Sequence, residues 1–463
     1  MKKVLITLQD LFNLQTARIY NPDAVKNISN VSIDSRTIKK KSLYIAIKGN
    51  KFDGHSFVND AVNKGASAVL INEKMLSKFD KLELPIITVK DTSIALGQLA
   101  NVWRNKLSAK VIGITGSNGK TTTKEITTLL LSEKYKVVST VANNNNHIGV
   151  PLTLFSANEK TEVVVLELGT NHFGEIPYTA AIAQPDFSII TNIGYSHIEF
   201  LKTPAGVKKE KQVLFDETAK RNGIVIINSD DKLLKPLIKK YRNSITYGFS
   251  EKNTVSGEVK GYTNDGRTIL EIKLKKEKIN VELPIYGLTN ARNILASVAI
   301  AYSLGLSKTN IIKGIGKLKP IKQRLVLKQL KDMVLIDDTY NANPASMQSA
   351  FELMSKINLY NKKIAILGDM FELGEKSLQL HKGLAAGIKK NGIGMVFTIG
   401  KMMKHLSDTL QKSEIIVQHF SNRNKLVKFL EECDLSNSVV LVKGSRGMKM
   451  EDFLQVIINR ESN

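Results

Sequence analysis

Cysteine, aromatic residues and long apolar runs are scarce in this sequence, and each scarcity excludes something. The single cysteine, Cys433, rules out an intramolecular disulfide and fits a reducing compartment. No apolar stretch approaches the roughly 18 residues that a membrane-spanning helix needs. The apolar start after Met1 is interrupted at Gln9 and Asp10 without a small-residue cleavage site, which argues against a signal peptide. We therefore expect a soluble, cytoplasmic protein without integral membrane association.

Acidic residues are also few beside the basic ones. The 67 Lys and Arg outweigh the 43 Asp and Glu, which gives a formal net charge of +24. Such an excess suggests an anionic partner, which could be nucleic acid, an acidic membrane surface or a polyphosphate substrate, or else a lysine-rich solvated surface. Aromatic residues make up only 6% and do not interleave with basic clusters, as single-stranded nucleic acid would require. We therefore expect no nucleic-acid partner.

Length and hydrophobic pattern predict three α/β domains, at 1–108, 109–319 and 320–463. The 463 residues correspond to roughly three domains of about 150 residues each. From residue 110, apolar β-branched runs alternate with helical patterns, as in parallel sheets with crossover helices. Residues 244–285 instead hold several strands, with a hairpin signal at Asn264-Asp265-Gly266. The expected parallel strands are Lys110–Thr115, Glu162–Leu168, Phe187–Thr191, Ile224–Asn228, Met333–Asp337, Ile364–Leu367, Met395–Ile399, Ile415–Gln418 and Val439–Val442.

The strongest functional signal is a glycine-rich loop between a predicted strand and a predicted helix. The strand Lys110–Thr115 enters this loop, and Lys120 then opens the helix. Such a loop directs backbone N–H groups at phosphate, while the lysine neutralises charge and the next threonine binds Mg²⁺. An ordinary glycine-rich turn is the alternative. The residues expected to bind ATP here are Gly116, Ser117, Asn118, Gly119, Lys120, Thr121 and Thr122.

Further polar residues follow the central strands, at the edge of the sheet where ligands bind in α/β folds. An asparagine-rich loop spans residues 143–146, Glu167 closes one apolar run, His197 follows the next, and Lys211 comes fourteen residues later. Taken singly, each has an ordinary explanation. A strand-end carboxylate can cap a helix, a lone histidine is more often structural, and Lys211 lies in a lysine-rich helix face.

The order of these motifs resembles that of the Mur ligase family, which builds the peptide stem of bacterial cell-wall precursors. The segment Thr115–Thr122 resembles the family's phosphate loop, and the resemblance covers nearly the whole chain. It implies a small UDP-sugar-binding domain, a central P-loop ATPase-like domain and a Rossmann-like C-terminal domain. It also implies ATP and two Mg²⁺, held by Thr121, Glu167, His197 and a carbamylated Lys211.

The resemblance implies site residues along the rest of the chain. Asn290, Arg324 and Asp338 would contact the nucleotide, although Thr289 and Gln323 depart from the family's usual His and Gly. The residues implied for catalysis are Lys120, Glu167, His197, Lys211, Asn341 and Asn343. The residues implied for substrate binding are Ser35, Arg36, Asp53, Gly54, His55, Asn143, Asn145, Asn146, Tyr340, Ser445 and Arg446.

The third-domain motifs match the family member that adds D-alanyl-D-alanine to a UDP-N-acetylmuramoyl-tripeptide. These motifs are Gly368–Glu375 and Val442–Arg446, and the Asp-Asn-Pro-Arg motif of a sibling is not found. The expected ADP-forming ligation passes through an acyl phosphate, because a carboxylate has no good leaving group of its own. By resemblance the chain would be a monomer. The alternatives are a sibling ligase, including one joining glutamate to folates, a nucleic-acid-binding ATPase, and a non-catalytic binding module.

Overall fold

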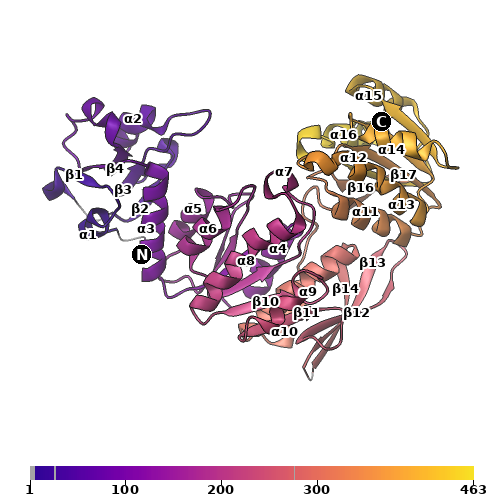
Figure 1. Cartoon of the computed structure of the whole chain (residues 1–463), viewed down its shortest axis with the longest axis horizontal. Helices are drawn as coiled ribbons and strands as arrows, with labels where there is room; N and C mark the ends of the chain where they lie inside the picture. The colour runs from indigo at the N-terminus through magenta and orange to yellow at the C-terminus, as the bar shows by residue number, and fades with distance from the viewer. Residues whose placement is uncertain (1–5, 26–27, 276, 463) are drawn as a thin grey trace.

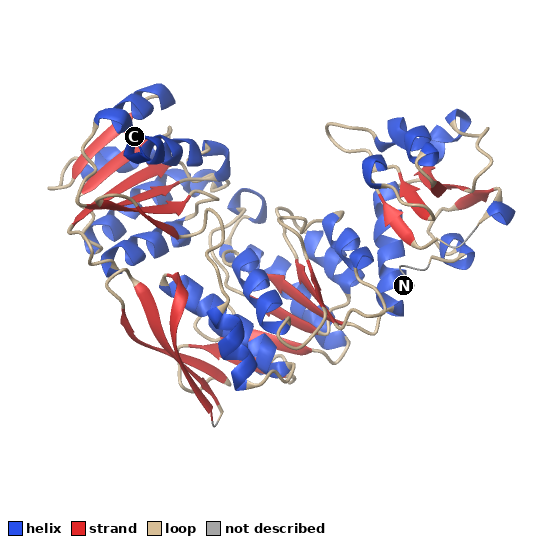
Figure 2. Ribbon diagram, turned by 180° about the vertical axis from the view of Figure 1, so that it is seen from behind, coloured by secondary structure: helices blue, strands red, loops and turns tan. Residues whose placement is uncertain are grey.

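Three sheets arranged along a crescent make up the molecule, as Figures 1 and 2 show from opposite sides. The computed structural model describes residues 6–25, 28–275 and 277–462, so the Met1–Leu5 part of the apolar start lies outside it. The first block, indigo in Figure 1, and the third block, yellow, form the two ends of the crescent. Within the described ranges, no helix is both long enough and apolar enough to cross a bilayer.

The first block contains a five-stranded sheet in the order β1-β5-β4-β3-β2, in which only β1 runs antiparallel. Buried apolar side chains cover the sheet on both faces. Its elements are α1 (Leu8–Phe12), β1 (Arg18–Tyr20), β2 (Asn30–Ser32), β3 (Ser42–Ile45), α2 (Val58–Asn63), β4 (Ala66–Asn72), β5 (Ile86–Val89) and α3 (Thr92–Lys106).

Helix α3 joins the first block firmly to the central block. It begins at Asp91, whose carboxylate accepts from the N–H groups of Ser93 and Ile94. At its other end, the buried Arg104 donates to the Ala183 carbonyl at 3.0 Å and to Asp186 Oδ2 at 2.8 Å. Both partners of this guanidinium lie in the central block, so Arg104 anchors the end of α3 to that block.

The central block contains a nine-stranded sheet in the order β14-β13-β12-β11-β10-β9-β6-β8-β7. The strands are parallel from β7 to β12, and β12, β13 and β14 form an antiparallel extension. The strands are β6 (Lys110–Thr115), β7 (Val137–Ser139), β8 (Val163–Glu167), β9 (Phe187–Ile190), β10 (Ile224–Asn228), β11 (Ser244–Gly248), β12 (Val255–Tyr262), β13 (Arg267–Leu274) and β14 (Glu277–Tyr286). The helices are α4 (Lys120–Leu131), α5 (Gly149–Ser156), α6 (Glu175–Ala183), α7 (Ile198–Leu201), α8 (Pro204–Lys220), α9 (Leu288–Ser303) and α10 (Lys308–Gly316).

The third block contains a six-stranded sheet in the order β15-β16-β20-β17-β18-β19, parallel except for β15. The strands are β15 (Val326–Gln329), β16 (Met333–Asp338), β17 (Lys362–Gly368), β18 (Met395–Ile399), β19 (Ile416–Phe420) and β20 (Ser438–Lys443). The helices are α11 (Pro344–Lys356), α12 (Ser377–Lys382), α13 (Leu384–Lys390), α14 (Met403–Leu410), α15 (Arg423–Glu432) and α16 (Glu451–Ser462).

The predicted α/β class, the alternating strands and the hairpin are confirmed by these three sheets. Strand ends differ by a residue or two: the run predicted at Glu162–Leu168 is a strand only over Val163–Glu167. The Leu168 carbonyl accepts from the Thr115 hydroxyl at 2.8 Å, so the chain has already turned into the loop there. The domain boundaries at 108 and 319 stay predictions, since one apolar cluster includes Leu99 and Val150 on either side of the first.

Candidate active site

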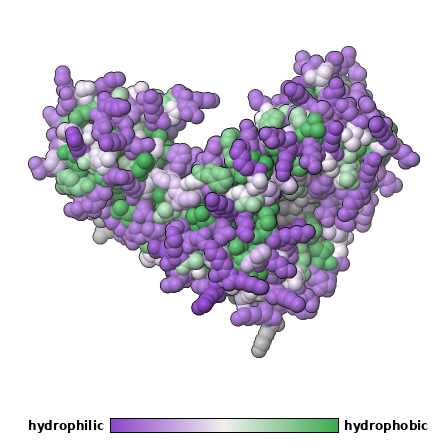
Figure 3. Space-filling view, viewed as in Figure 1, coloured by the Kyte–Doolittle hydropathy of each residue, from purple (hydrophilic) through white to green (hydrophobic). Residues whose placement is uncertain are grey.

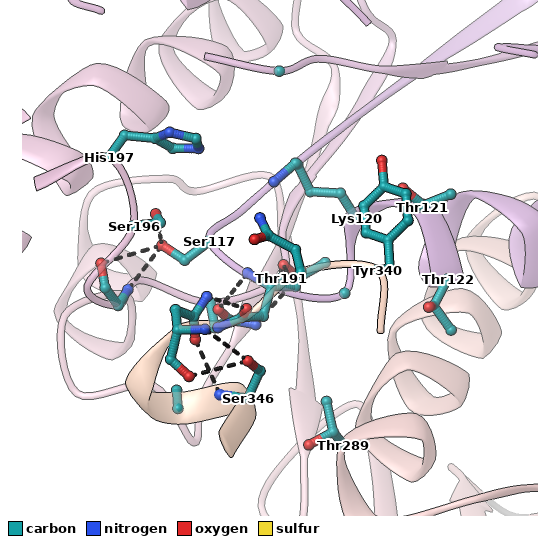
Figure 4. Close-up of a pocket in the computed structure, with 18 of the residues that line it drawn as sticks. Ser117, Lys120, Thr121, Thr122, Thr191, Ser196, His197, Thr289, Tyr340 and Ser346 are labelled. Carbon is teal, nitrogen blue, oxygen red and sulfur yellow. Dashed lines mark hydrogen bonds between the residues drawn. The ribbon is translucent and has the colours of Figure 1, made fainter. Parts of the chain in front are cut away.

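A cavity of about 790 Å³ lies between the central and third blocks, where strands of both sheets end. Figure 3 shows the concave face of the crescent to which this region belongs, and Figure 4 shows the pocket itself. Most of the predicted site residues line it: Ser117, Asn118, Gly119, Lys120, Thr121, Thr122, Asn145, Asn146, Glu167, His197, Asn290, Arg324, Asp338, Tyr340, Asn341, Asn343, Ser445 and Arg446. Outside the lining are Gly116, Asn143, Lys211 and the five predicted residues of the first block.

The loop between β6 and α4 has the backbone of an anion site. Gly119 has φ of +78° directly before α4, and a Cβ there would lie 2.4 Å from Asn293 Oδ1, so only glycine fits. Asn192 holds the loop from β9: its amide accepts from Asn118 N and donates to Asn118 O, both at 3.0 Å. The N-terminus of α4 is thereby presented to the cavity, where it favours a bound anion.

Lys120 extends from the first turn of α4 into the pocket (Figure 4). Its Nζ donates to the Gly116 carbonyl at 2.8 Å. Burial lowers the pKa of the Lys120 ammonium, Glu167 opposes this and Arg324 adds to it. A phosphate group placed here would supply the counter-charge that the loop itself lacks.

Glu167 ends β8 with its carboxylate inside the site. Oε1 accepts from Asn145 Nδ2 at 2.8 Å, whereas the buried Oε2 has no hydrogen-bond partner. A buried carboxylate oxygen without a partner is costly unless a cation or donor meets it. The structure thus places Asn145 as a support of Glu167, while its predicted contact with substrate stays a prediction.

Lys211 lies on α8 beneath the cavity wall, with no measurable exposure and no hydrogen-bond partner for Nζ. Burial, and then the nearby charge of Lys120, lower the pKa of Lys211 well below its ordinary value. The carboxylate of neighbouring Glu210 accepts instead from Gly174 N and Ile176 N, at 3.0 and 2.7 Å. An unpaired amine that is readily neutral is the form that adds to CO₂, so the site is compatible with the predicted carbamate.

His197 precedes α7 in a left-handed conformation with φ of +53°. Its Nδ1 lies 2.6 Å from Glu372 Oε2 of the third block, but the ring is not aligned for a hydrogen bond. When the imidazole is protonated, this contact is an ion pair, and His197 lowers the pKa of Glu372. His197 lies on the other side of the pocket from Thr289 (Figure 4).

The donors around the phosphate loop fit Mg²⁺ bound together with a nucleotide. Among the described residues no three His, Cys, Asp or Glu side chains are grouped to hold a metal by themselves. Mg²⁺ in nucleotide sites takes one or two protein oxygens and completes its shell with phosphates and water. The hydroxyl of Thr121 and the unpartnered oxygen of Glu167 are such donors, whereas Lys211 fits only as a carbamate.

Side chains of the third block and the preceding linker already contact the phosphate loop. Asn343, which caps α11, donates through Nδ2 to Asn118 Oδ1 at 2.6 Å. The Arg324 guanidinium lies 3.9 Å from the centre of the Tyr340 ring and donates to Thr121 Oγ1 at 3.3 Å. The two blocks therefore contribute to one site.

Ser445 and Arg446 follow β20 and have different surroundings. Ser445 is buried, and its hydroxyl accepts from Phe371 N at 2.8 Å, so it ties two strand-end loops together. Arg446 is exposed and pairs with Glu451 at 2.8 Å. Both line the cavity, and their predicted contacts with the dipeptide stay predictions.

The predicted first-block residues lie far along the crescent from the cavity. His55 is buried: Nδ1 contacts Asp53 Oδ1 at 2.6 Å and Nε2 accepts from Asn72 N at 3.0 Å, so both ring nitrogens are engaged within the block. Arg36 is exposed, and its pairing lowers the pKa of Asp34 to about 2. Ser35 is buried beside them and Gly54 adjoins His55. This arrangement gives no support for a direct contact between His55 and the substrate.

The sequence interpretation missed cavity residues that follow β10. Asp230, Asp231, Tyr247 and Arg292 line the cavity, and Asp231 Oδ2 accepts from Ile193 N at 2.7 Å. The sequence could have indicated these residues, because a pair of carboxylates just after a buried strand lies at the edge of the sheet where ligands bind.

Comparison with known proteins matches all three blocks. Residues 27–104 match the model described as Mur ligase family, catalytic domain, residues 114–301 match the Mur ligase middle domain, and residues 323–446 match the Mur ligase glutamate ligase domain. UDP-N-acetylmuramoyl-tripeptide–D-alanyl-D-alanine ligase from Bacillus subtilis is 34% identical over 98% of both chains. The protein of that name from Escherichia coli is 31% identical over 98% of both chains.

Solved structures agree with these sequence matches over the full length. A crystal structure of MurF from Acinetobacter baumannii superimposes with a TM-score of 0.87 at 28% identity, covering 99% of this chain and 100% of that one. MurF ligase from Thermotoga maritima in complex with ADP gives a TM-score of 0.83 at 29% identity, covering 94% of this chain and 98% of that one.

Proposed function

The chain belongs to the Mur ligase family, and we propose that it joins D-alanyl-D-alanine to a UDP-N-acetylmuramoyl-tripeptide with hydrolysis of ATP to ADP. One observation carries the proposal: the phosphate loop and the strand-end loops of the third block face one cavity. Relatives of that name cover this chain from end to end, and a structural neighbour is complexed with ADP. The enzyme would thus act in peptidoglycan precursor synthesis.

The reaction follows from the chemistry of the carboxylate. A tripeptide carboxylate oxygen attacks the γ-phosphorus of ATP, and ADP leaves. The amine of D-alanyl-D-alanine then attacks the acyl carbon, the C–O bond to phosphate breaks, and the amine loses a proton. Both steps bring anions together, so positioning and charge neutralisation dominate the catalysis.

The residues of the central block would carry the phosphate chemistry. The α4 N-terminus and Lys120 would hold the β and γ phosphates, since both present positive charge to the cavity. Mg²⁺, when bound, supplies further neutralisation, and Thr121 and Glu167 would hold one ion. His197 and carbamylated Lys211 would hold a second ion once His197 has left Glu372.

The third block would receive the dipeptide and complete the site. Asn341, Asn343 and Tyr340 lie at the cavity, while Asp338 and Arg324 would contact the nucleotide together with Asn290. The UDP end of the substrate would bind the first block near Arg36 and Asp53. Because α3 fixes the first block, we infer that the third block closes over the reacting groups and excludes water.

Product analysis tests this function directly. The protein is incubated with ATP, Mg²⁺, the nucleotide-sugar tripeptide and D-alanyl-D-alanine, and products are weighed by mass spectrometry. We expect the mass of the pentapeptide product with one ADP per amide, and loss of at least about 100-fold in Lys120→Ala. Product only with glutamate or another amino acid would indicate a sibling ligase, and unchanged ATP-dependent phosphate release in Lys120→Ala would contradict the site.

A further inference from the structure

A buried lysine that was not among the predicted site residues lines the cavity between two of its loops. Lys443 is the last residue of β20, is paired in register with Asp338 at the end of β16, and is 1% exposed. Its Nζ donates to Asp338 Oδ2 at 2.5 Å and to the Asn341 carbonyl at 2.9 Å. A buried ammonium is costly unless it is paired, and here a carboxylate supplies the counter-charge while two of its three N–H groups find acceptors.

The same carboxylate holds the linker that enters the third block. Asp338 Oδ1 accepts from Leu325 N at 3.2 Å, and the Gln323 carbonyl accepts from Tyr340 N at 3.1 Å. Gln323 and Leu325 both have positive φ, +62° and +50°, a conformation that costs free energy for residues other than glycine. These hydrogen bonds keep the linker in that conformation.

The linker in turn places Arg324 on the phosphate loop. Arg324 stacks on Tyr340 and donates to Thr121 Oγ1, as described above. Through the Asn341 carbonyl, Lys443 also holds the loop that leads to Asn343, which donates to Asn118. Lys443 thus supports both contacts that the linker and the third block make with the phosphate loop.

We propose that Lys443 is a positioning residue for ligation, which acts through Asp338 and the linker to set Arg324 against the nucleotide site. The inference rests on the proposed function. It assigns to this lysine the alignment of the two blocks rather than a contact with substrate. Removing the ammonium therefore affects turnover more than substrate binding, because the aligned arrangement is needed for phosphoryl transfer.

A double-mutant cycle with Arg324 tests the proposal. K443M and R324A are each expected to lower kcat about 100-fold. Independent effects would multiply to a loss of about 10,000-fold in the double variant, whereas we expect its kcat to be little lower than that of either single variant. KM for the tripeptide and for D-alanyl-D-alanine is expected to stay within about threefold. K362M is the matched control, since Lys362 begins β17, at the other end of the strands from Lys443, and donates to the Asp434 carbonyl.

Each outcome decides between positioning and other roles. Multiplicative losses in the double variant, or a K443M variant as active as K362M, would overturn the inference. A loss confined to KM would indicate direct substrate contact and would overturn it as well. If K443M does not fold, the cycle is repeated with K443M combined with D338N, so that neither charge of the pair is left buried without its partner. Absence of product from the unaltered protein would instead refute the proposed function.

Discussion

At the scale of single residues, two unpartnered polar atoms belong to the predicted metal ligands. Glu167 Oε2 and Lys211 Nζ are buried without hydrogen-bond partners within one block. Buried polar atoms are normally paired, so such atoms indicate a ligand or a modification that the polypeptide alone does not supply. Both residues had been predicted as metal ligands, Glu167 directly and Lys211 as its carbamate.

Lys211 gives the sharpest residue-scale prediction. In Lys211→Ala we expect ligase activity to fall at least about 100-fold, since one carboxylate-type ligand is lost. Acetate or formate is expected to restore part of it by entering the space that the side chain leaves. Activity is measured with and without millimolar acetate or formate. Lys209→Ala, on the same helix, is the control. Full activity in Lys211→Ala, or no rescue by any short acid, would count against the carbamate.

The pH dependence of that modification has a definite sign. Burial lowers the pKa of Lys211, so its amine is neutral at a lower pH than that of an ordinary lysine. CO₂ adds to the neutral amine, and protonation reverses the addition. We expect the carbamate signal in ¹³C spectra under labelled CO₂ to rise with pH and to vanish on acidification. A carbamate signal that grows as the pH falls would contradict this assignment.

At the scale of elements, the loop after β17 is held by buried groups with structural roles. Asp369 accepts from Met402 N and Met403 N at the start of α14, at 3.1 and 2.7 Å. His381, on α12, accepts from Met370 N through Nε2 at 2.9 Å. This loop carries Glu372 to His197, so its order affects the contact between the blocks.

His381 makes the stability of this loop depend on pH. Burial lowers the pKa of His381, so the folded state disfavours the charged form. In the unfolded chain, this histidine takes up a proton near pH 6.5. Below that pH, the free energy of unfolding decreases by up to about 1.4 kcal/mol per pH unit. The difference between the melting temperatures at pH 5.5 and pH 7.5 is expected to be smaller in His381→Gln than in the unaltered protein. Equal differences would show that His381 does not contribute.

The sequence predicted elements well because their signals are local. Strands such as β6 and β10 are continuous apolar runs, and Gly119-Lys120 opens α4 where the motif places it. Contacts between segments far apart in the sequence could not be predicted in this way: the pairing of Lys443 with Asp338 depends on β16 and β20 lying side by side. Likewise, the burial of His55 depends on how its loop packs, which spacing does not reveal.

At the scale of the whole molecule, the crescent leaves the first block away from the cavity and the third block in contact with it (Figure 1). The third block is held by polar contacts, among them Asn343 with Asn118, Thr289 with Ser349, and His197 with Glu372, and by apolar packing of Tyr286 against its core. At the α3 junction, one continuous apolar core includes residues on both sides of the boundary.

Weakening one of these contacts is expected to loosen the attachment of the third block to the central block. In Glu372→Gln the ion pair with His197 is lost, which for partly exposed partners is worth about 0.2–1 kcal/mol. Small-angle scattering of the nucleotide-free protein is expected to give a broader size distribution than that of Glu375→Gln, a matched change three residues away. Identical scattering from both variants would mean that this pair does not hold the third block.

In the proposed reaction, one cavity activates a carboxylate by phosphorylation before the amine attacks. The most direct measurement uses tripeptide substrate labelled with ¹⁸O in its terminal carboxylate and follows the label during ligation. If the carboxylate is phosphorylated, one labelled oxygen leaves with phosphate, and mass spectrometry of the released phosphate finds one ¹⁸O per amide formed. Amide formation with unlabelled phosphate, or with the label in AMP, would contradict the account.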